Sequence, residues 1–375
     1  MSQVRVAGAG HTPFGASKLS LGELAVQAAE GALARADLRE VDAVVVGVME
    51  PMGTLGEAHI SSKVMDALCL PPRAAVRVEA GPATGAAALH AGFWQVASGA
   101  HRAVLVVAAE KLSHLGSRAA SGVLARIATE GERALGLTMP GMTALLARAY
   151  MHRHGATEED LADLAVKAHA LGASNPRAHL RRAVTREQVL AGPMVADPLR
   201  RHNCAPLSDG AVAVLLTSRD GAPVTVTGTG AATDRVRYQD RRAADGFPAT
   251  RLAADRALAM AHRRASDVRL VETHDAFSNL EWSNLEDMGL MPPGGALAAA
   301  RKGETMPGGR LPVNPSGGLT AKGHPAGATG LGQVAEVFWQ LAGEAEGPQV
   351  DARVGLSHSI GGFGASVFVT VLEAA

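Results

Sequence analysis

The 375-residue chain contains only two cysteines, Cys69 and Cys204, and no excess of charge of either sign. Two widely separated cysteines fit neither a metal-ligand spacing nor a disulfide framework, so we predict no bound metal and no disulfide. The 36 lysines and arginines equal the 36 acidic residues in number. A net charge of zero argues against nucleic acid or an anionic membrane surface as the main partner.

Long apolar runs are also missing: no stretch reaches membrane-spanning length, and we expect no signal peptide because the first residues lack a charged region followed by an apolar run. We therefore predict a cytoplasmic protein. Aromatic residues make up only 3% of the chain, whereas 47% is hydrophobic and 43 residues are glycine. A large core is expected, built from small, closely packed side chains. One local basic cluster stands out, formed by Arg235, Arg237, Arg241 and Arg242.

Valine-rich apolar runs alternate with helix-forming segments in the first third of the chain. Ser20 and Glu23 fit a capping box, which predicts that a helix begins at Leu21. This alternation predicts an α/β fold with a mostly parallel sheet covered by helices. The predicted strands are 4–8, 43–48, 76–79 and 103–109. The predicted helices are 21–34, 59–70 and one that residues 81–85 open and that continues to about Ser98.

Residues 111–197 interrupt the alternation with helices, one of which is predicted to be capped by Thr157 and Asp160. We interpret this region as a helical insertion that packs over the sheet. Strands and helices resume near Pro223. We therefore divide the chain into an N-terminal half, 1–220, and a C-terminal half, 221–375.

The two halves contain similar segments. Residues 210–217 and 364–371 are both small, apolar closing strands. Residues 82–85 and 325–330 each open an Ala/Gly-rich helix that carries a Phe-Trp-Gln sequence. An internal duplication explains these pairs. Two similar sheets with small-residue helices between them would make the alanine and glycine content a packing requirement.

The segment 314–330 contains five glycines and two prolines, so we expect no regular helix or strand through its first half. It holds His324 at a Gly-His-Pro turn, and we expect a helix from Gly330 to Leu341. Such a loop is typical of either a buried turn with a structural histidine or an anion site at a helix start. No phosphate-binding GxxxxGK[ST] motif is present, so a nucleotide is disfavoured.

The sequence of this segment resembles the signature of the thiolase superfamily, because it reads Asn-Pro-Ser-Gly-Gly followed by Gly-His-Pro and Gly-Ala-Thr-Gly. It is most similar to the sterol-carrier-protein and archaeal acetyl-CoA acetyltransferase branch. Three further motifs of that branch are matched in order, at 208–211, 273–277 and 357–364. The resemblance implies a duplicated αβαβα layered fold.

The resemblance also implies what the protein binds. The substrate would be a coenzyme A or carrier-protein thioester, with no covalently bound cofactor. The chain would form a homodimer, or a heteromer with another thiolase-like chain, and this branch often has a small zinc-ribbon/OB-fold partner.

The family's two reactive cysteines have no counterpart at the matching positions. The nucleophile of the family's Cys-Ala-Ser-Gly segment is matched by Pro82, and the cysteine of its His-Asp-Cys-Phe motif by Ala276. Cys204 matches a structural segment, which favours a core thiol. Thr84 and the phenol of Tyr238 are the alternative reactive groups, and Tyr150 is the only other phenol.

What the resemblance retains is the electrostatic part of the site. It implies that His324 and His274 converge on the thioester or keto oxygen, each donor contributing roughly 3–4 kcal/mol to an oxyanion. Peptide N–H groups around Gly362 would form a second oxyanion hole. His358 is either a proton-transfer group or a hydrogen-bonded core histidine. Asn314 would fix His324.

Three functions fit these residues. The first is cysteine-independent C–C bond chemistry on an acyl thioester, either aldol or retro-aldol cleavage or decarboxylation. The second is a non-catalytic, thiolase-like subunit of a heteromeric acyltransferase complex. The third is acetyl-CoA acetyltransferase activity, which requires a thiolate from elsewhere in the chain.

Overall fold

A computed structural model describes residues 2–38, 40–241 and 246–375, so Arg242 of the basic cluster lies outside the described residues. Within these ranges, a nine-stranded sheet has the order β3-β2-β4-β7-β1-β8-β11-β10-β9. A separate ribbon pairs β5 with β6. The strands are β1 (Val4–His11), β2 (Ala43–Gly47), β3 (Ala74–Val78), β4 (Ala103–Glu110), β5 (Met194–Ala196), β6 (Leu199–Arg200), β7 (Gly210–Thr217), β8 (Val224–Thr233), β9 (Leu270–Thr273), β10 (Val354–Gly361) and β11 (Ser366–Ala374).

The sheet is mixed, so the prediction of a mostly parallel sheet was wrong. β2 runs parallel to β3 and β4, and β9 runs parallel to β10. β7 is antiparallel to both β4 and β1, and β11 is antiparallel to both β10 and β8. A helical crossover makes the strands that it joins parallel. Strands that meet after long or tight connections can run either way, and the alternation pattern carries no information about their direction.

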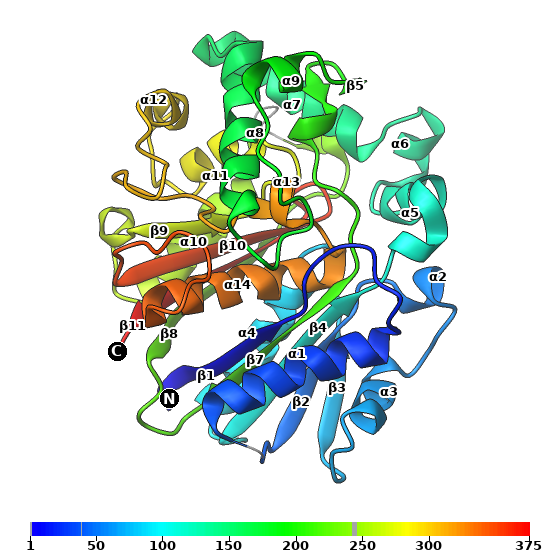
Figure 1. Cartoon of the computed structure of the whole chain (residues 1–375), viewed down its shortest axis with the longest axis vertical. Helices are drawn as coiled ribbons and strands as arrows, with labels where there is room; N and C mark the ends of the chain where they lie inside the picture. Colours follow the sequence, from blue (N-terminus) through cyan, green and yellow to red (C-terminus); the bar gives the residue numbers. More distant parts are fainter. Residues whose placement is uncertain (1, 39, 242–245) are drawn as a thin grey trace.

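Helices form layers on the sheet. α4 (Thr84–Ala97) and α14 (Ala326–Ala342) pack against each other in the middle of the molecule, and Figure 1 shows α14 passing between the strands of the two halves. α1 (Leu21–Ala36) covers β1 and β7, and α10 (Pro248–Met260) covers β8 and β11. The predicted layered α/β architecture is therefore confirmed.

The contact between α4 and α14 explains the small residues. A side-chain carbon on Gly85 would lie 2.6 Å from the backbone nitrogen of Leu331, and one on Gly330 would lie 2.7 Å from that of Ala86. Any larger residue would force the two helices apart, because such contacts are far shorter than van der Waals distance. The glycines at this crossing are a packing requirement, as the sequence predicted.

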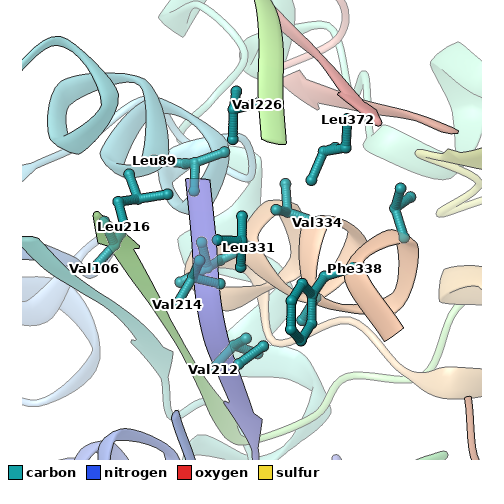
Figure 2. Close-up of a cluster of buried hydrophobic side chains, with 14 of the residues drawn as sticks. Leu89, Val106, Val212, Val214, Leu216, Val226, Leu331, Val334, Phe338 and Leu372 are labelled. Atoms are coloured by element: carbon teal, nitrogen blue, oxygen red, sulfur yellow. The ribbon is translucent and has the colours of Figure 1, made fainter. Parts of the chain in front are cut away.

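The main apolar core surrounds α14. Figure 2 shows Leu331 of α14 beside Val214 of β7, with Val212 further along β7, Val334 further along α14 and Leu89 of α4 on the neighbouring side. All five side chains are fully enclosed. Full burial of a branched aliphatic side chain stabilises the fold by about 1.5–3 kcal/mol. The same cluster fixes the position of the amino end of α14.

The strand order is consistent with a duplicated fold. From the centre of the sheet outwards, one side reads β1, β7, β4, β2, β3 and the other reads β8, β11, β10, β9, so the first series has one additional edge strand. The two series meet where β1 pairs with β8. Each series begins with a strand covered by an outer helix and continues with a closing strand.

The remaining helices lie at the edges and over the sheet. Thr157 and Asp160 form the predicted capping box at the start of α8. The segment 318–322 is helical, contrary to the expectation for the first half of the glycine-rich loop, and α14 begins at Ala326, four residues before the predicted start. The helices are α2 (Pro51–Thr54), α3 (Ile60–Ala67), α5 (Gly116–Ala125), α6 (Glu130–Ala134), α7 (Met139–His154), α8 (Glu158–Ala173), α9 (Arg186–Leu190), α11 (Leu280–Asp287), α12 (Gly295–Arg301) and α13 (Gly318–Lys322).

In the part of the chain that the structure describes, every helix is too short or too polar to cross a bilayer.

Candidate functional site

Three chain segments meet at the amino end of α14. His274 directly follows β9, and His324 lies two residues before α14. A loop from the N-terminal half joins them, because the Ala205 N–H donates to the Ala276 carbonyl at 2.9 Å and the His324 N–H donates to the Pro206 carbonyl at 3.1 Å. Pro206 and His324, which are 118 positions apart in the sequence, are thereby held in one place.

The imidazoles of His274 and His324 lie side by side. Their ring centroids are 5.2 Å apart and their planes are nearly perpendicular, at 89°. Burial lowers the pKa of His324 to about 4. The pKa of His274 lies well below its usual value, first because of burial and then because of the neighbouring His324 and His358. Both rings are therefore neutral at pH 7.

The two histidines line a cavity of about 240 Å³. Pro82, Ala276 and Gly362 are also on its wall. None of the described residues that line it carries a formal charge, and most are apolar. The larger apolar members are Leu124, Ile127, Met139, Leu207, Phe247, Phe277, Leu280, Ile360 and Phe363. An uncharged, hydrophobic group fits such a lining.

Pro82 stands just before α4 and has neither a reactive side chain nor a backbone N–H. The Gly362 peptide lies close by, since a side-chain carbon on Gly81 would be 3.4 Å from the Gly362 nitrogen. Gly362 has a φ of 66°, which favours glycine. A side chain on Gly361 would meet the Ala80 carbonyl oxygen at 2.2 Å. The two glycines let this turn approach the cavity closely.

His358 is near enough to His274 to lower its pKa, but it is not part of the cavity wall. It is in β10, and it is completely buried. Its Nδ1 is 2.9 Å from the Thr273 hydroxyl and its Nε2 is 3.2 Å from the Thr250 hydroxyl. Burial lowers its pKa to about 3. Because both ring nitrogens are engaged, the geometry favours the hydrogen-bonded core histidine that the sequence left as the alternative.

Asn314 does not hold His324, contrary to the implication of the resemblance. Its side-chain oxygen accepts a hydrogen bond from the Thr273 N–H at 2.7 Å, which ties the glycine-rich loop to the end of β9. The group that contacts the His324 ring is the Thr329 hydroxyl, 2.7 Å from Nδ1. Sequence reasoning missed Thr329, although a hydroxyl in the first turn after Gly-His-Pro was an available signal.

The hydroxyl-bearing residues Thr84, Tyr150 and Tyr238 do not line the cavity. Thr84 is buried, donates to the Gly81 carbonyl at 2.6 Å and accepts from the Ala80 N–H at 2.9 Å, so it closes the turn before α4. The Tyr150 hydroxyl donates to Glu286 at 2.6 Å, away from this cavity. The ring of Tyr238 packs against Phe363, with centroids 5.6 Å apart.

Cys204 lines the cavity, which sequence reasoning did not anticipate. Its thiol donates weakly to the Arg200 carbonyl at 3.5 Å. Burial raises the pKa of this thiol to about 12, so it stays protonated and a poor nucleophile at neutral pH. Cys69 is exposed and is not part of the cavity wall.

One buried ion pair and two buried hydrogen bonds to carboxyl groups hold the glycine-rich loop in place. Lys322 pairs with Glu336 of α14 at 3.3 Å. The Ser316 hydroxyl donates to Glu272 at 2.8 Å, and the Leu319 N–H donates to Asp275 at 2.7 Å. These contacts fix the part of the loop that precedes the Gly-His-Pro turn. Burial raises the pKa of Glu272 and of Asp275 to about 7.

Across residues 2–38, 40–241 and 246–375, no group of three or more His, Cys, Asp and Glu side chains is arranged to hold a metal ion.

Family models match both halves of the chain. The model of the thiolase N-terminal domain matches residues 4–220, and the model described as thiolase C-terminal domain-like matches residues 230–374. The chain therefore belongs to the thiolase superfamily.

Curated relatives include proteins of the two types that the sequence motifs indicated. An acetyl-CoA acetyltransferase of Methanothermobacter thermautotrophicus is 39% identical over the full length of both chains. Sterol carrier protein 2 of Homo sapiens is 30% identical over 100% of this chain and 72% of its own length. The benzoylsuccinyl-CoA thiolase subunit BbsB of Thauera aromatica is 30% identical over 96% and 95% of the two chains.

Solved structures confirm the fold class. A chain of the Ltp2-ChsH2(DUF35) aldolase superposes with a TM-score of 0.84, at 24% identity, covering 99% of this chain and 98% of that chain. Human mitochondrial 3-ketoacyl-CoA thiolase in complex with CoA superposes with a TM-score of 0.77, at 18% identity, covering 100% and 98%. At these identities the likeness concerns the fold alone.

Proposed function

We propose that this protein binds an acyl-CoA or acyl-carrier thioester in the cavity of His274 and His324 and performs C–C bond chemistry without a covalent acyl-cysteine. The chemistry is aldol or retro-aldol cleavage, or decarboxylation. The observation that carries the proposal is the pairing of two neutral imidazoles, 5.2 Å apart, in an uncharged cavity that they share with Pro82 and Ala276. The names of the relatives support a thioester, and the aldolase supports C–C cleavage.

The positions matched to the family's cysteines explain why an acyl-enzyme is not part of the proposal. Pro82 and Ala276 offer no thiolate, and Cys204 is held as a neutral thiol. Both reactions instead pass through an enolate, whose oxygen needs hydrogen-bond donors. One such donor is worth about 10²–10³ in rate in a cavity that excludes water. His274 and the Gly362 peptide are the proposed donors.

The test is turnover by a cysteine-free chain. The double variant Cys69→Ala, Cys204→Ala is incubated with a 3-hydroxyacyl-CoA, and carbonyl and acyl-CoA products are quantified by mass spectrometry. We expect cleavage within about tenfold of the wild-type rate, because no thiolate takes part. A fall of about 10³-fold or more with an intact fold, or an acylated Cys204 in the wild type, would refute the proposal.

A non-catalytic subunit is the second candidate. It is favoured by the proline in place of a nucleophile and by the aldolase structure, whose name describes a complex with a DUF35 protein. In this case the chain would assemble with a second thiolase-like chain or a small zinc-ribbon/OB-fold partner. Affinity purification from the native host, followed by acyl-CoA labelling of the copurified proteins, separates the two. An acylated partner together with an inactive isolated chain would favour the subunit.

Acetyl-CoA acetyltransferase activity is the third candidate, supported only by the names of the archaeal relatives. It requires an acylated residue in this chain. The test is incubation with radiolabelled acetyl-CoA, followed by peptide mapping of Cys69 and Cys204. The absence of label on both cysteines would exclude this activity, because the reaction passes through an acetylated residue.

We also propose that β3 pairs with the same strand of a second copy. β3 ends the main sheet, and Val76 is 47% exposed there. An exposed edge strand is a template for pairing with another chain. Val76→Lys is expected to shift the molecular mass in solution from dimer to monomer, measured by light scattering. An unchanged mass would place the interface elsewhere.

A further inference from the structure

On the basis of the function proposed above, we propose that the two imidazoles have opposite roles, with Thr329 selecting between them. His274 presents an N–H to the substrate's carbonyl oxygen. His324 presents a bare nitrogen that accepts a proton from the substrate. The family resemblance alone implied that both rings act as donors to one oxygen, so this assignment changes the role of His324.

The contacts of Thr329 set the tautomer of His324. Its hydroxyl has a single hydrogen, which it donates to the Pro325 carbonyl at 3.1 Å. The same oxygen is 2.7 Å from Nδ1 of His324, so it accepts there and Nδ1 carries the hydrogen. In a neutral ring, Nε2 then has a free lone pair. The ring also stands at the amino end of α14, where the helix dipole disfavours an imidazolium.

His274 has the reverse arrangement. Its Nδ1 is enclosed and has no hydrogen-bond partner among the described residues. An enclosed N–H without an acceptor is rarer and costlier than an enclosed lone pair, so the hydrogen belongs on Nε2. Because His274 lines the cavity, that N–H is the one available to a ligand. The two rings thus present one donor and one acceptor, 5.2 Å apart between centroids.

A 3-hydroxyacyl thioester uses both groups in a balanced reaction. Nε2 of His324 takes the hydroxyl proton, the bond between Cα and Cβ breaks, and Cβ leaves as an aldehyde or ketone. The electron pair passes through Cα to the thioester oxygen, where the N–H of His274 stabilises the enolate. His324 then returns its proton to Cα. The net change is cleavage into a carbonyl compound and a shorter acyl thioester, with no oxidant or reductant.

The same arrangement disfavours decarboxylation. A β-carboxylate would face the lone pair of His324, and no Lys or Arg is among the described residues that line the cavity. A buried carboxylate without a partner is costly. The structure therefore assigns retro-aldol cleavage of an uncharged 3-hydroxyacyl thioester, rather than loss of CO₂ from a charged one.

The tautomers can be read directly from the free protein. Two-bond ¹H–¹⁵N correlation spectra of histidine-labelled protein distinguish Nδ1–H from Nε2–H rings, and His274→Gln and His324→Gln assign the signals. We expect Nε2–H for His274 and Nδ1–H for His324. An Nε2–H tautomer of His324, or an Nδ1–H tautomer of His274, would overturn the assignment.

Variants of the threonines test the role of Thr329. Thr329→Val should move His324 away from the pure Nδ1–H tautomer and lower kcat with little change in KM, whereas Thr329→Ser should restore both. Thr250→Val is the matched control, because it removes an equivalent contact to His358 outside the cavity. It should alter only the His358 signals. An Nδ1–H signal of His324 that persists in Thr329→Val would show that Thr329 does not select the tautomer.

Turnover separates this inference from the proposed function. With the expected tautomers and no cleavage of any thioester, the proposed function and the retro-aldol roles fail, and only the tautomer assignment stands. With cleavage and the opposite tautomers, the function stands and the assignment fails. His324→Gln should lower the rate of cleavage by about 10²–10⁴-fold, the usual contribution of a positioned base.

Discussion

Replacing Pro82 by cysteine should convert this protein into one that forms an acyl-enzyme. Pro82 lines the cavity at the start of α4, next to the Gly362 peptide and in the same cavity as His324. Cysteine introduces a thiol and a backbone N–H together. The amino end of α4 favours a thiolate, and the proposed free nitrogen of His324 can accept the thiol proton.

The stability cost should be small and the chemical gain large. Removing a proline from a turn frees the unfolded chain and costs about 0.4–1 kcal/mol, against a total stability of about 5–15 kcal/mol. One added oxyanion donor contributes about 10²–10³ in rate. We therefore expect Pro82→Cys to be folded and to accumulate close to one acetyl group per chain with acetyl-CoA.

Intact-mass spectrometry after incubation with acetyl-CoA measures this. Pro82→Ala is the matched control, because it introduces the N–H without a thiol and should stay unmodified, as should the wild type. Adding His324→Gln to Pro82→Cys should slow acetylation. The reasoning is refuted if the folded Pro82→Cys protein remains unmodified, or if the wild type is acetylated on Cys204 to the same extent.

Two further predictions concern the buried groups around the site. The pKa of Asp275 is raised by burial to about 7, so the native state holds this proton more tightly than the unfolded chain and wild-type stability is lost as pH rises from about 4 to 7. The variant Asp275→Asn cannot lose stability in this way. The difference between its free energy of unfolding in urea and that of the wild type should therefore increase by about 4 kcal/mol as pH rises across that range. A difference that does not depend on pH would contradict the prediction. His358→Gln should lower the free energy of unfolding by about 1–3 kcal/mol, because Thr250 and Thr273 lose buried partners, while KM and kcat stay within a few fold. A selective loss of kcat in a stably folded His358→Gln would instead place His358 in the proton path.

The sequence by itself determined the family, the layered α/β fold and most helix and strand positions. These depend on short-range information: apolar periodicity, the capping boxes at Ser20 and Thr157, and the glycines where α4 meets α14. That Pro82 and Ala276 stand at the positions of the family's two reactive cysteines stays a prediction, because it depends only on matching short motifs.

Only the tertiary structure decided which side chains share the cavity. His358 and His324 are equally prominent in the motifs, yet one is enclosed between two threonines and the other lines the cavity. Cys204 joins the cavity wall through a loop from the other half of the chain, and Thr329 rather than Asn314 contacts His324. The alternation of apolar runs and helix-forming segments likewise did not predict the direction of the strands. Each of these features depends on packing between distant segments, whereas a sequence motif reports only what its own few residues favour.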